Sequence, residues 1–210
     1  MYPEGRPFPM SKAILALRSA DPILGGLIDK VGSYRIRYLE PDFEALAKSI
    51  VYQQLSGKVA ATIFGRLRDA GGDGRLTPAS LLRLTPAGMR ALGLSKQKIA
   101  YIRDIAAHVE SGAADFQAMR RMKDEEVMRV LTSLKGVGIW TAHMFLIFAL
   151  RRKDILASGD LGVRVAVQQA YGLEELPTPA EVDELGERWR PYRTVATWYL
   201  WRSLEPNANL

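Results

Sequence analysis

Residues 131–160 read LTSLKGVGIWTAHMFLIFALRRKDILASGD, and the rest of the chain is organised around this stretch. Its pattern predicts a helix that ends near Leu134, a tight turn at residues 135–138 and a second helix that begins at about Ile139. Gly136 and Gly138 in the turn permit positive φ angles and place no side chain between the backbone and a ligand. Such a turn directs unpaired N–H groups outward at a helix start, where the helix dipole favours an anion. The stretch therefore indicates a phosphate-binding hairpin between two helices.

The composition of the chain narrows the possible classes of protein. Its 210 residues are 48% hydrophobic, which suffices for one large domain or two small ones. It has no cysteine, so disulfides, Cys-ligated zinc and iron–sulfur clusters are excluded. No apolar run approaches the roughly 20 residues that cross a bilayer, and the first residues, MYPEGRPFPM, do not read as a signal peptide. We therefore expect a cytoplasmic protein without a membrane partner, nucleoid-associated if bacterial. The net charge of +6 suits a polyanionic ligand.

Outside the hairpin the sequence also has the periodicity of α-helices. From Phe43 to Val51 the apolar residues recur at i, i+3, i+4, i+7 and i+8, which forms one buried helix face. A second stripe of this kind lies within residues 96–110. The one strand-like segment, residues 34–38, is too short to found a sheet. The sequence therefore predicts an all-α fold of about ten helices joined by short loops. Further helices are expected at residues 12–20, 58–69, 78–84, 86–92, 124–133, 139–150, 161–171, 180–187 and 191–204.

The LxGVGxxTA pattern of the hairpin, with Asp160 following 24 residues after Gly136, resembles the helix–hairpin–helix (HhH-GPD) superfamily of DNA glycosylases. Within it the chain is most similar to the alkyladenine branch, the 3-methyladenine DNA glycosylase II type. Residues 53–56, QQLS, resemble the QQ(I/L)S loop of that family. The resemblance implies a two-lobed helical fold with a DNA-binding cleft between the lobes. Residues 42–158 would form the hairpin-bearing lobe, and residues 1–41 plus 159–210 the other. Longer relatives carry an N-terminal β-rich domain, for which residues 1–41 are too short.

Asp160 has two compatible interpretations. From the local sequence it is the N-cap of a helix that begins at Leu161, a position where Asp is common. A carboxylate at a helix start stays ionised. The resemblance implies that Asp160 is also the catalytic residue. The anion would face C1′ of the target deoxyribose, stabilise the oxocarbenium-like transition state as the N-glycosidic bond breaks, and position the attacking water.

Trp140 stands where related glycosylases that also cleave the strand carry a Schiff-base lysine. The resemblance therefore implies monofunctional hydrolysis that leaves an abasic site, since Lys135 lies in the turn and not at that position. It also implies a base pocket, because aromatic faces attract cationic alkylated purines. The residues implied for this pocket are Trp140, Met144, Trp189 and Tyr192. Core packing is the alternative for Trp140, and helix packing is the alternative for the C-terminal aromatic residues Trp189, Tyr192, Trp198 and Trp201.

The resemblance also assigns residues to the grip on DNA. Gln54, with Leu55 as second choice, would insert into the duplex and fill the gap left by a flipped base; a simple turn is the alternative. Backbone N–H groups and side chains near the hairpin would contact phosphates: Gly136, Val137, Gly138, Lys135, Ser56, Lys58 and Arg164. Family members hold a monovalent cation through hairpin carbonyls, which by position implicates a structural Na⁺ or K⁺ at Thr132, Leu134 and Val137. No other cofactor is implied.

These expectations describe a monofunctional DNA glycosylase that excises alkylated purines such as 3-methyladenine and 7-methylguanine by base flipping, within base excision repair. Its partner would be duplex DNA that contains alkylated bases, and a monomer is expected. Two alternatives stay open. One is a bifunctional glycosylase and lyase for oxidised bases, and the other is a non-catalytic hairpin module that only binds DNA.

Overall fold

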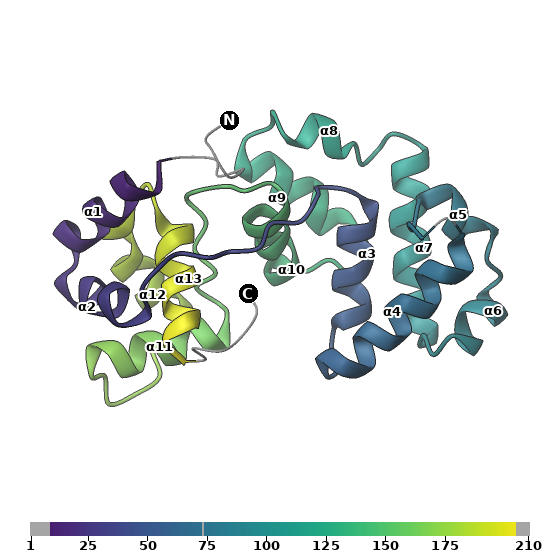
Figure 1. Cartoon of the computed structure of the whole chain (residues 1–210). Coiled ribbons are helices and arrows are strands. Elements are labelled where there is room, and N and C mark those ends of the chain that lie inside the picture. The colour runs from purple at the N-terminus through teal and green to yellow at the C-terminus, as the bar shows by residue number, and fades with distance from the viewer. Residues whose placement is uncertain (1–8, 73, 205–210) are drawn as a thin grey trace. The chain divides into compact units, whose positions relative to one another are not determined.

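The computed structural model describes residues 9–72 and 74–204, which form helices joined by turns and loops, with no β-strand (Figure 1). The all-α prediction is confirmed. The α-helices are α1 (Met10–Ala20), α2 (Pro22–Val31), α3 (Phe43–Tyr52), α4 (Gly57–Gly71), α5 (Pro78–Arg83), α6 (Pro86–Ala91), α7 (Lys96–Glu110), α8 (Phe116–Met119), α9 (Asp124–Ser133), α10 (Ile139–Met144), α11 (Leu161–Tyr171), α12 (Pro179–Gly186) and α13 (Arg193–Leu204). A π-helical turn, Phe145–Ala149, follows α10, and a 3₁₀ turn, Glu187–Trp189, follows α12. Within the described ranges, no helix combines the length and the apolar character needed to cross a membrane.

The chain divides into two compact units. The first, called the hairpin unit, consists of Leu39–Phe145. The second, called the terminal unit, combines the residues up to Tyr38 with those from Leu146 onward. The division expected from the sequence lies at residues 42 and 158, so the two divisions differ mainly in the assignment of residues 146–158.

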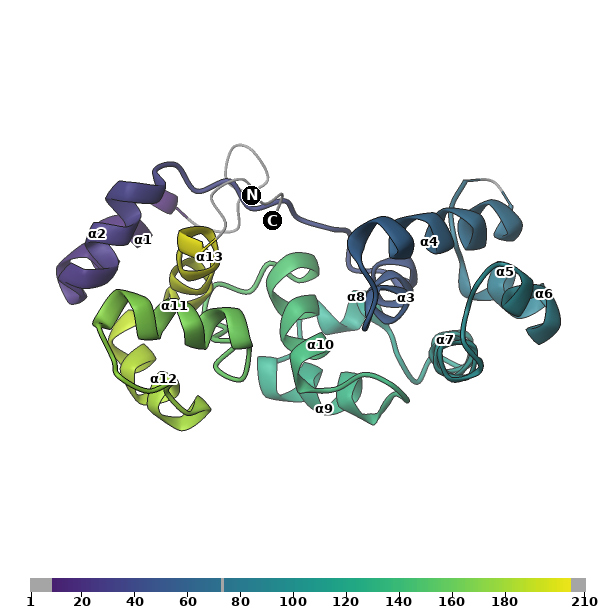
Figure 2. The ribbon, with the colours of Figure 1, turned by 90° about the horizontal axis from the view of Figure 1, so that it is seen from below.

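In the hairpin unit, α7 is the central helix, because α3, α5 and α6 all pack against it (Figures 1 and 2). These contacts are apolar, since both stripes expected from the sequence face inward. Burial of each large aliphatic side chain contributes about 1.5–3 kcal/mol relative to exposure. The buried residues are Phe43, Leu46, Ala47, Ile50 and Val51 of α3 and Ile99, Ile102, Ile105 and Ala106 of α7.

Side-chain caps set the beginnings of several helices in this unit. Asp42 Oδ1 accepts a hydrogen bond from Ala45 N at 2.9 Å at the start of α3. Ser95 Oγ accepts one from Lys98 N at the start of α7. Each cap satisfies an N–H that has no partner within its own helix, which stabilises the helix by about 1 kcal/mol.

In the terminal unit, α13 packs against α2 and α11, and α1 packs against α2 (Figure 1). The segment Thr194–Leu200 of α13 is buried throughout, so this helix is enclosed on all sides. Asp21 is 1% exposed and caps α2, and its Oδ2 accepts hydrogen bonds from Trp189 Nε1 at 2.9 Å and from Tyr171 Oη. This buried carboxylate therefore joins α2, α11 and the 3₁₀ turn into one core.

Three local expectations differ from the structure. Residues 34–38 form no strand, because no strand pairs with them in the described part of the chain; Tyr34 packs on Trp198 with ring centroids 4.6 Å apart. The helix expected at residues 139–150 is α-helical only to Met144 and then widens into the π turn. The short helix α8 lies where no helix was expected.

Candidate functional site

The hairpin joins α9 to α10 as the sequence predicts. Leu134 is buried and ends α9, and Gly138 is the N-cap of α10. Gly136 adopts φ +80°, and a Cβ at this position would lie 2.2 Å from Tyr101 Cδ2, so only glycine fits. The N–H groups of Gly136 and Gly138 donate to no group among the described residues. Both are therefore available to an anion at the start of α10.

Two of the expected phosphate contacts at the hairpin already have partners. Val137 N donates to Leu134 O at 3.1 Å, which closes the turn, so its N–H is not open to a phosphate as expected. Lys135 donates from its backbone N to Asp104 Oδ2 at 3.2 Å, and its Nζ lies 3.1 Å from Asp104 Oδ1. Burial raises the pKa of Asp104, but the bonds and charge of Lys135 outweigh burial and lower the pKa overall. The Lys135 side chain is 70% exposed despite this ion pair, so its role as a phosphate contact stays a prediction.

The loop between α3 and α4 presents the expected wedge residues on the surface. Gln54 is exposed and has φ +56°, a left-handed conformation that costs a non-glycine residue about 1–2 kcal/mol. Leu55 is 38% exposed. Ser56 is the N-cap of α4 without a side-chain capping bond, and Lys58 is exposed in the first turn of that helix. Residues 53 and 54 form a turn, and the exposed side chain of Gln54 is compatible with the wedge role, which stays a prediction.

Two side chains that the sequence did not single out anchor this loop. Gln53 Nε2 donates to Gly136 O at 3.0 Å and lies 3.4 Å from Thr141 Oγ1. Lys98 Nζ donates to Val51 O at 2.7 Å and to Gln53 O at 2.6 Å. Burial lowers the pKa of Lys98. These contacts join the wedge loop, the hairpin and α7 within the hairpin unit.

A cavity of about 460 Å³ lies among these elements. Thr132, Leu134 and Val137, expected to hold a monovalent cation, share its wall. Carbonyl oxygens suit a hard cation, although the carbonyl of Leu134 already accepts the Val137 N–H. The other lining residues are Gln53, Gln54, Ser95, Gln97, Lys98, Tyr101, Gly136 and Gly138.

Asp160 lies in the terminal unit as the N-cap of α11, which confirms the capping interpretation. Its Oδ1 accepts hydrogen bonds from Val163 N at 2.9 Å and from Trp201 Nε1 at 2.8 Å. The residue is partly exposed and is not enclosed in the core. Gly162 makes room for this arrangement, because a Cβ there would lie 3.0 Å from Asp160 Oδ1 and 3.3 Å from Trp201 Cδ1.

The aromatic residues differ in what they can contact. Trp140 is 49% exposed, so the core-packing interpretation is wrong for it, and Met144 beside it is half-buried. Trp189 is 0% exposed, and its indole N–H is bonded to Asp21. The expectation that Trp189 walls a base pocket is therefore corrected: it is a core residue with no face open to a ligand. Trp201, for which the sequence offered helix packing as an alternative, stacks on Phe148 and also donates to Asp160.

Two other expected site residues are more enclosed than the sequence suggested. Tyr192 is buried, with Lys153 Nζ 5.8 Å from its ring centroid. Arg164 Nε donates to Pro177 O at 2.7 Å, so its guanidinium holds the loop before α12. This bond engages only the Nε–H of Arg164, so its role as a phosphate contact stays a prediction.

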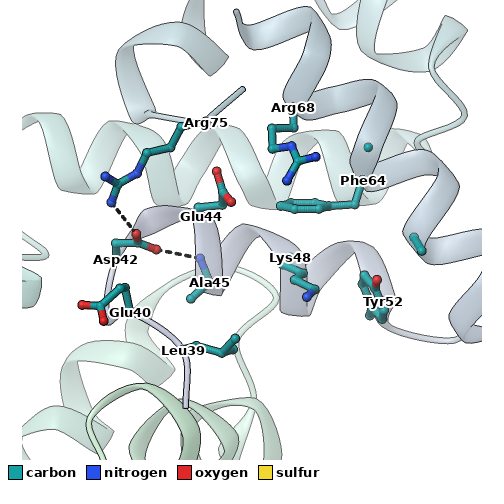
Figure 3. A pocket seen from close by; sticks show the side chains of 12 residues that line it. Leu39, Glu40, Asp42, Glu44, Ala45, Lys48, Tyr52, Phe64, Arg68 and Arg75 are labelled. Carbon is teal, nitrogen blue, oxygen red and sulfur yellow. Dashed lines mark hydrogen bonds and ion pairs between the residues drawn. The ribbon is translucent and has the colours of Figure 1, made fainter. Parts of the chain in front are cut away.

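A second cavity of the hairpin unit, of about 490 Å³, lies between α3 and α4 (Figure 3). Asp42 Oδ2 pairs with Arg75 Nη2 at 2.7 Å across it, and Glu44 Oε2 accepts the Leu76 N–H at 2.6 Å. Arg68 and Phe64 of α4 also line this cavity. These contacts fasten the segment after α4 to the start of α3, and the mixture of both charges gives this cavity no selectivity for an anion.

We compared the chain with family models, with curated proteins and with solved structures. A family model described as "HhH-GPD superfamily base excision DNA repair protein" matches residues 47–191. The chain is 34% identical to DNA-3-methyladenine glycosylase 1 of Schizosaccharomyces pombe, over 92% of this chain and 87% of that protein. The crystal structure of a DNA-3-methyladenine glycosidase from Bacillus halodurans aligns with a TM-score of 0.85 at 37% identity, over 95% of this chain and 90% of that one. The Schizosaccharomyces pombe 3-methyladenine DNA glycosylase in complex with abasic DNA aligns with a TM-score of 0.82 at 34% identity, over 94% and 99%.

Proposed function

This chain belongs to the HhH-GPD superfamily of base excision DNA repair proteins, and from that premise we propose that it is a monofunctional DNA glycosylase for alkylated purines. It hydrolyses the N-glycosidic bond of bases such as 3-methyladenine and 7-methylguanine in duplex DNA and leaves an abasic site. The observation that carries the proposal is the fixed carboxylate of Asp160, held by the N–H groups of Val163 and Trp201. Trp140 at the position of the lyase lysine supports hydrolysis without strand cleavage.

Hydrolysis of the N-glycosidic bond of an alkylated purine requires little from the protein beyond one anion. Alkylation at N3 or N7 makes the base cationic, so the base leaves as a neutral molecule with the electron pair of the C1′–N bond. Positive charge then develops on the sugar, and the Asp160 carboxylate stabilises it electrostatically. A water oxygen bonds to C1′, and its proton passes to the carboxylate or to solvent. Two N–H donors on Oδ1 hold the carboxylate in one orientation for this role.

DNA binding is the task of the hairpin unit. The N–H groups of Gly136 and Gly138 take a phosphate at the start of α10, with Lys58 and Ser56 as further contacts. Gln54 occupies the space left when the damaged base turns out of the duplex. The exposed face of Trp140 attracts the cationic base. A Na⁺ or K⁺ ion held by hairpin carbonyls would add positive charge near the same phosphate.

We further propose that the protein acts as a monomer on duplex DNA in the cytoplasm, bound to the nucleoid if bacterial. A single hairpin unit joined to a single Asp160 contains every residue invoked above, so no second copy is needed. Sedimentation of the protein alone and with a short duplex tests this: a complex of one protein per duplex is expected, and a stable dimer would contradict it.

The decisive experiment is release of base from methylated duplex DNA, followed by alkaline cleavage of abasic sites. The wild-type protein should release 3-methyladenine and 7-methylguanine, and Asp160→Asn should lose release while retaining DNA binding. Asp183→Asn, which removes an exposed acid from α12, is the matched control and should keep full activity. Duplex left intact by the wild-type protein would end the proposal in favour of a binding module. A covalent adduct trapped by borohydride would instead favour a bifunctional lyase.

A further inference from the structure

We propose that Lys98 is a positioning residue for the wedge loop, residues 53–56. Its ammonium group holds the end of α3 so that Gln54 keeps its strained, exposed conformation before DNA arrives. This inference rests on the proposed function, in which Gln54 fills the gap left by a flipped base, and it adds a residue that acts on catalysis only through that loop.

The first support is the pair of backbone carbonyls to which Lys98 donates hydrogen bonds. Its Nζ lies 2.7 Å from Val51 O and 2.6 Å from Gln53 O, at the C-terminal end of α3. The last carbonyls of a helix have no partner within the helix, and the negative end of the helix dipole lies there. A cation at this place gives the carbonyls a hydrogen-bond donor and lies at the negative end of the dipole. Lys98 therefore caps α3 from another helix and fixes the residue just before Gln54.

The second support is the backbone of Gln54 itself. A non-glycine residue at φ +56° reverts to an ordinary conformation unless its neighbours hold it. Gln53 is held twice: its carbonyl by Lys98, and its side-chain amide by Gly136 O at 3.0 Å. Gln54 thus follows a residue that is fixed at both its backbone and its side chain.

The third support is the helix on which Lys98 stands. One side of α7 also carries Tyr101, whose ring lies against Gly136, and Asp104, which holds Lys135. These residues are spaced three apart, as neighbours on one helix face are. The same rigid helix therefore holds the wedge loop through Lys98 and the hairpin turn through Tyr101 and Asp104. A loop fixed in this way loses less conformational entropy when it binds DNA.

A lysine at this place is not explained by packing. In the described part of the chain no carboxylate pairs with Lys98, while burial opposes its charge. An apolar side chain of similar length would fill the same space without that cost. The charge is useful because it draws two carbonyls together at the start of the wedge loop.

The test compares affinities for two duplexes: one with a tetrahydrofuran abasic-site analogue, which a wedge can enter, and one intact. Lys98→Met removes the donors and keeps the stem, and it should lower the preference for abasic over intact duplex by about tenfold, since hydrogen bonds to a charged group are worth this factor. Lys98→Arg should restore most of the preference. Lys96→Met, which removes an exposed charge from the same helix, should weaken both affinities equally.

A double-mutant cycle separates positioning from general damage. If Lys98 acts through Gln54, the preference lost by Gln54→Ala plus Lys98→Met should be no greater than that lost by Gln54→Ala alone. Losses that multiply would overturn the proposal. So would a Lys98→Met variant that behaves like Lys96→Met.

Hydrogen exchange of the free protein gives a readout that needs neither DNA nor activity. The amide of Leu55, which donates to Tyr52 O at 3.4 Å, should exchange faster in Lys98→Met and at the wild-type rate in Lys96→Met and Lys98→Arg. Amides in the middle of α4 should be unchanged, which excludes global unfolding as the cause. Unchanged exchange at Leu55 would overturn the inference even if the wild-type protein releases base. A wild-type protein that releases no base, with faster exchange in Lys98→Met, would instead refute only the proposed function.

Discussion

The indole Nε1 of Trp201 donates a hydrogen bond of 2.8 Å to Oδ1 of Asp160, across 41 residues of sequence. The same oxygen accepts the Val163 N–H, so the carboxylate is oriented from α13 as well as from its own helix. The ring of Trp201 is itself held, since it stacks on Phe148 at a centroid distance of 5.9 Å and an interplanar angle of 13°. The proposed catalytic carboxylate is therefore fixed by packing and by hydrogen bonds together.

Replacing Trp201 by Phe keeps the stacked ring and removes only the N–H donor. Base release in single turnover should fall by about tenfold. A hydrogen bond to a charged group is worth about 1.5–3 kcal/mol, and losing part of this energy makes the productive orientation of Asp160 less favourable. Phe148→Leu is the matched control: it weakens the stacking but leaves the donor, and it should retain more activity than Trp201→Phe. Equal rates for Trp201→Phe and wild type would show that the bond does not position Asp160.

Asp21 should make the stability of the protein depend on acid pH. Burial raises the pKa of Asp21, but the hydrogen bonds from Tyr171, Trp189 and Leu24 outweigh burial and lower the pKa in the folded state. A carboxyl group whose folded pKa is lowered contributes stability that is present above its unfolded pKa of about 3.8. That stability is lost as the pH falls through the folded value. Urea unfolding at pH 6 and pH 3 measures this loss in the wild-type protein.

Asp21→Asn should lower the unfolding free energy at pH 6 by about 2–4 kcal/mol, since it removes the charge from a buried cluster of donors. It should also flatten the difference between pH 6 and pH 3. Glu184→Gln, an exposed acid on α12, should behave like the wild type at both pH values. If the unfolding free energy falls equally between pH 6 and pH 3 in all three proteins, other carboxylates cause the acid sensitivity.

Gly136→Ala should damage both stability and DNA binding. An added Cβ would meet the Tyr101 ring at 2.2 Å, and φ +80° is unfavourable for alanine. The unfolding free energy should fall by about 2–4 kcal/mol from overpacking and backbone strain together. Gly65→Ala in the middle of α4, where no atom lies within 4 Å of the new Cβ, should instead stabilise by about 0.5–1 kcal/mol. Thermal unfolding measures both changes: the midpoint should fall in Gly136→Ala and rise in Gly65→Ala.

The salt dependence of DNA binding should distinguish a basic side chain that contacts phosphate from one that is bonded within the protein. Lys58 is exposed at the start of α4, so Lys58→Ala should reduce the slope of log affinity against log salt by about 1. Arg164 is bonded to Pro177 O, so Arg164→Ala should leave that slope close to the wild-type value. A reduced slope for Arg164→Ala would show that its remaining guanidinium donors contact a phosphate.

Helices and caps could be predicted from the sequence because their causes are local. The apolar stripe of α3 is buried at all five positions, and Asp160 caps α11, since helix period and N-cap preference depend on residues within about four positions. The hairpin was recognisable for the same reason: a turn that excludes side chains has few sequences, and Gly136 proved to be in contact with Tyr101.

Tertiary structure decided the tasks of chemically similar side chains. Trp189 is a buried donor to Asp21, 168 residues away in sequence, while Trp140 is half exposed and Trp201 holds Asp160. Nothing within a few residues of each tryptophan distinguishes these roles, because each depends on what packs against it from distant parts of the chain. Likewise, Gln53 and Lys98 read as ordinary polar residues until folding brings them to Gly136 O and the end of α3. Local sequence determined the helices and the turn, and long-range packing determined which side chains reach the site.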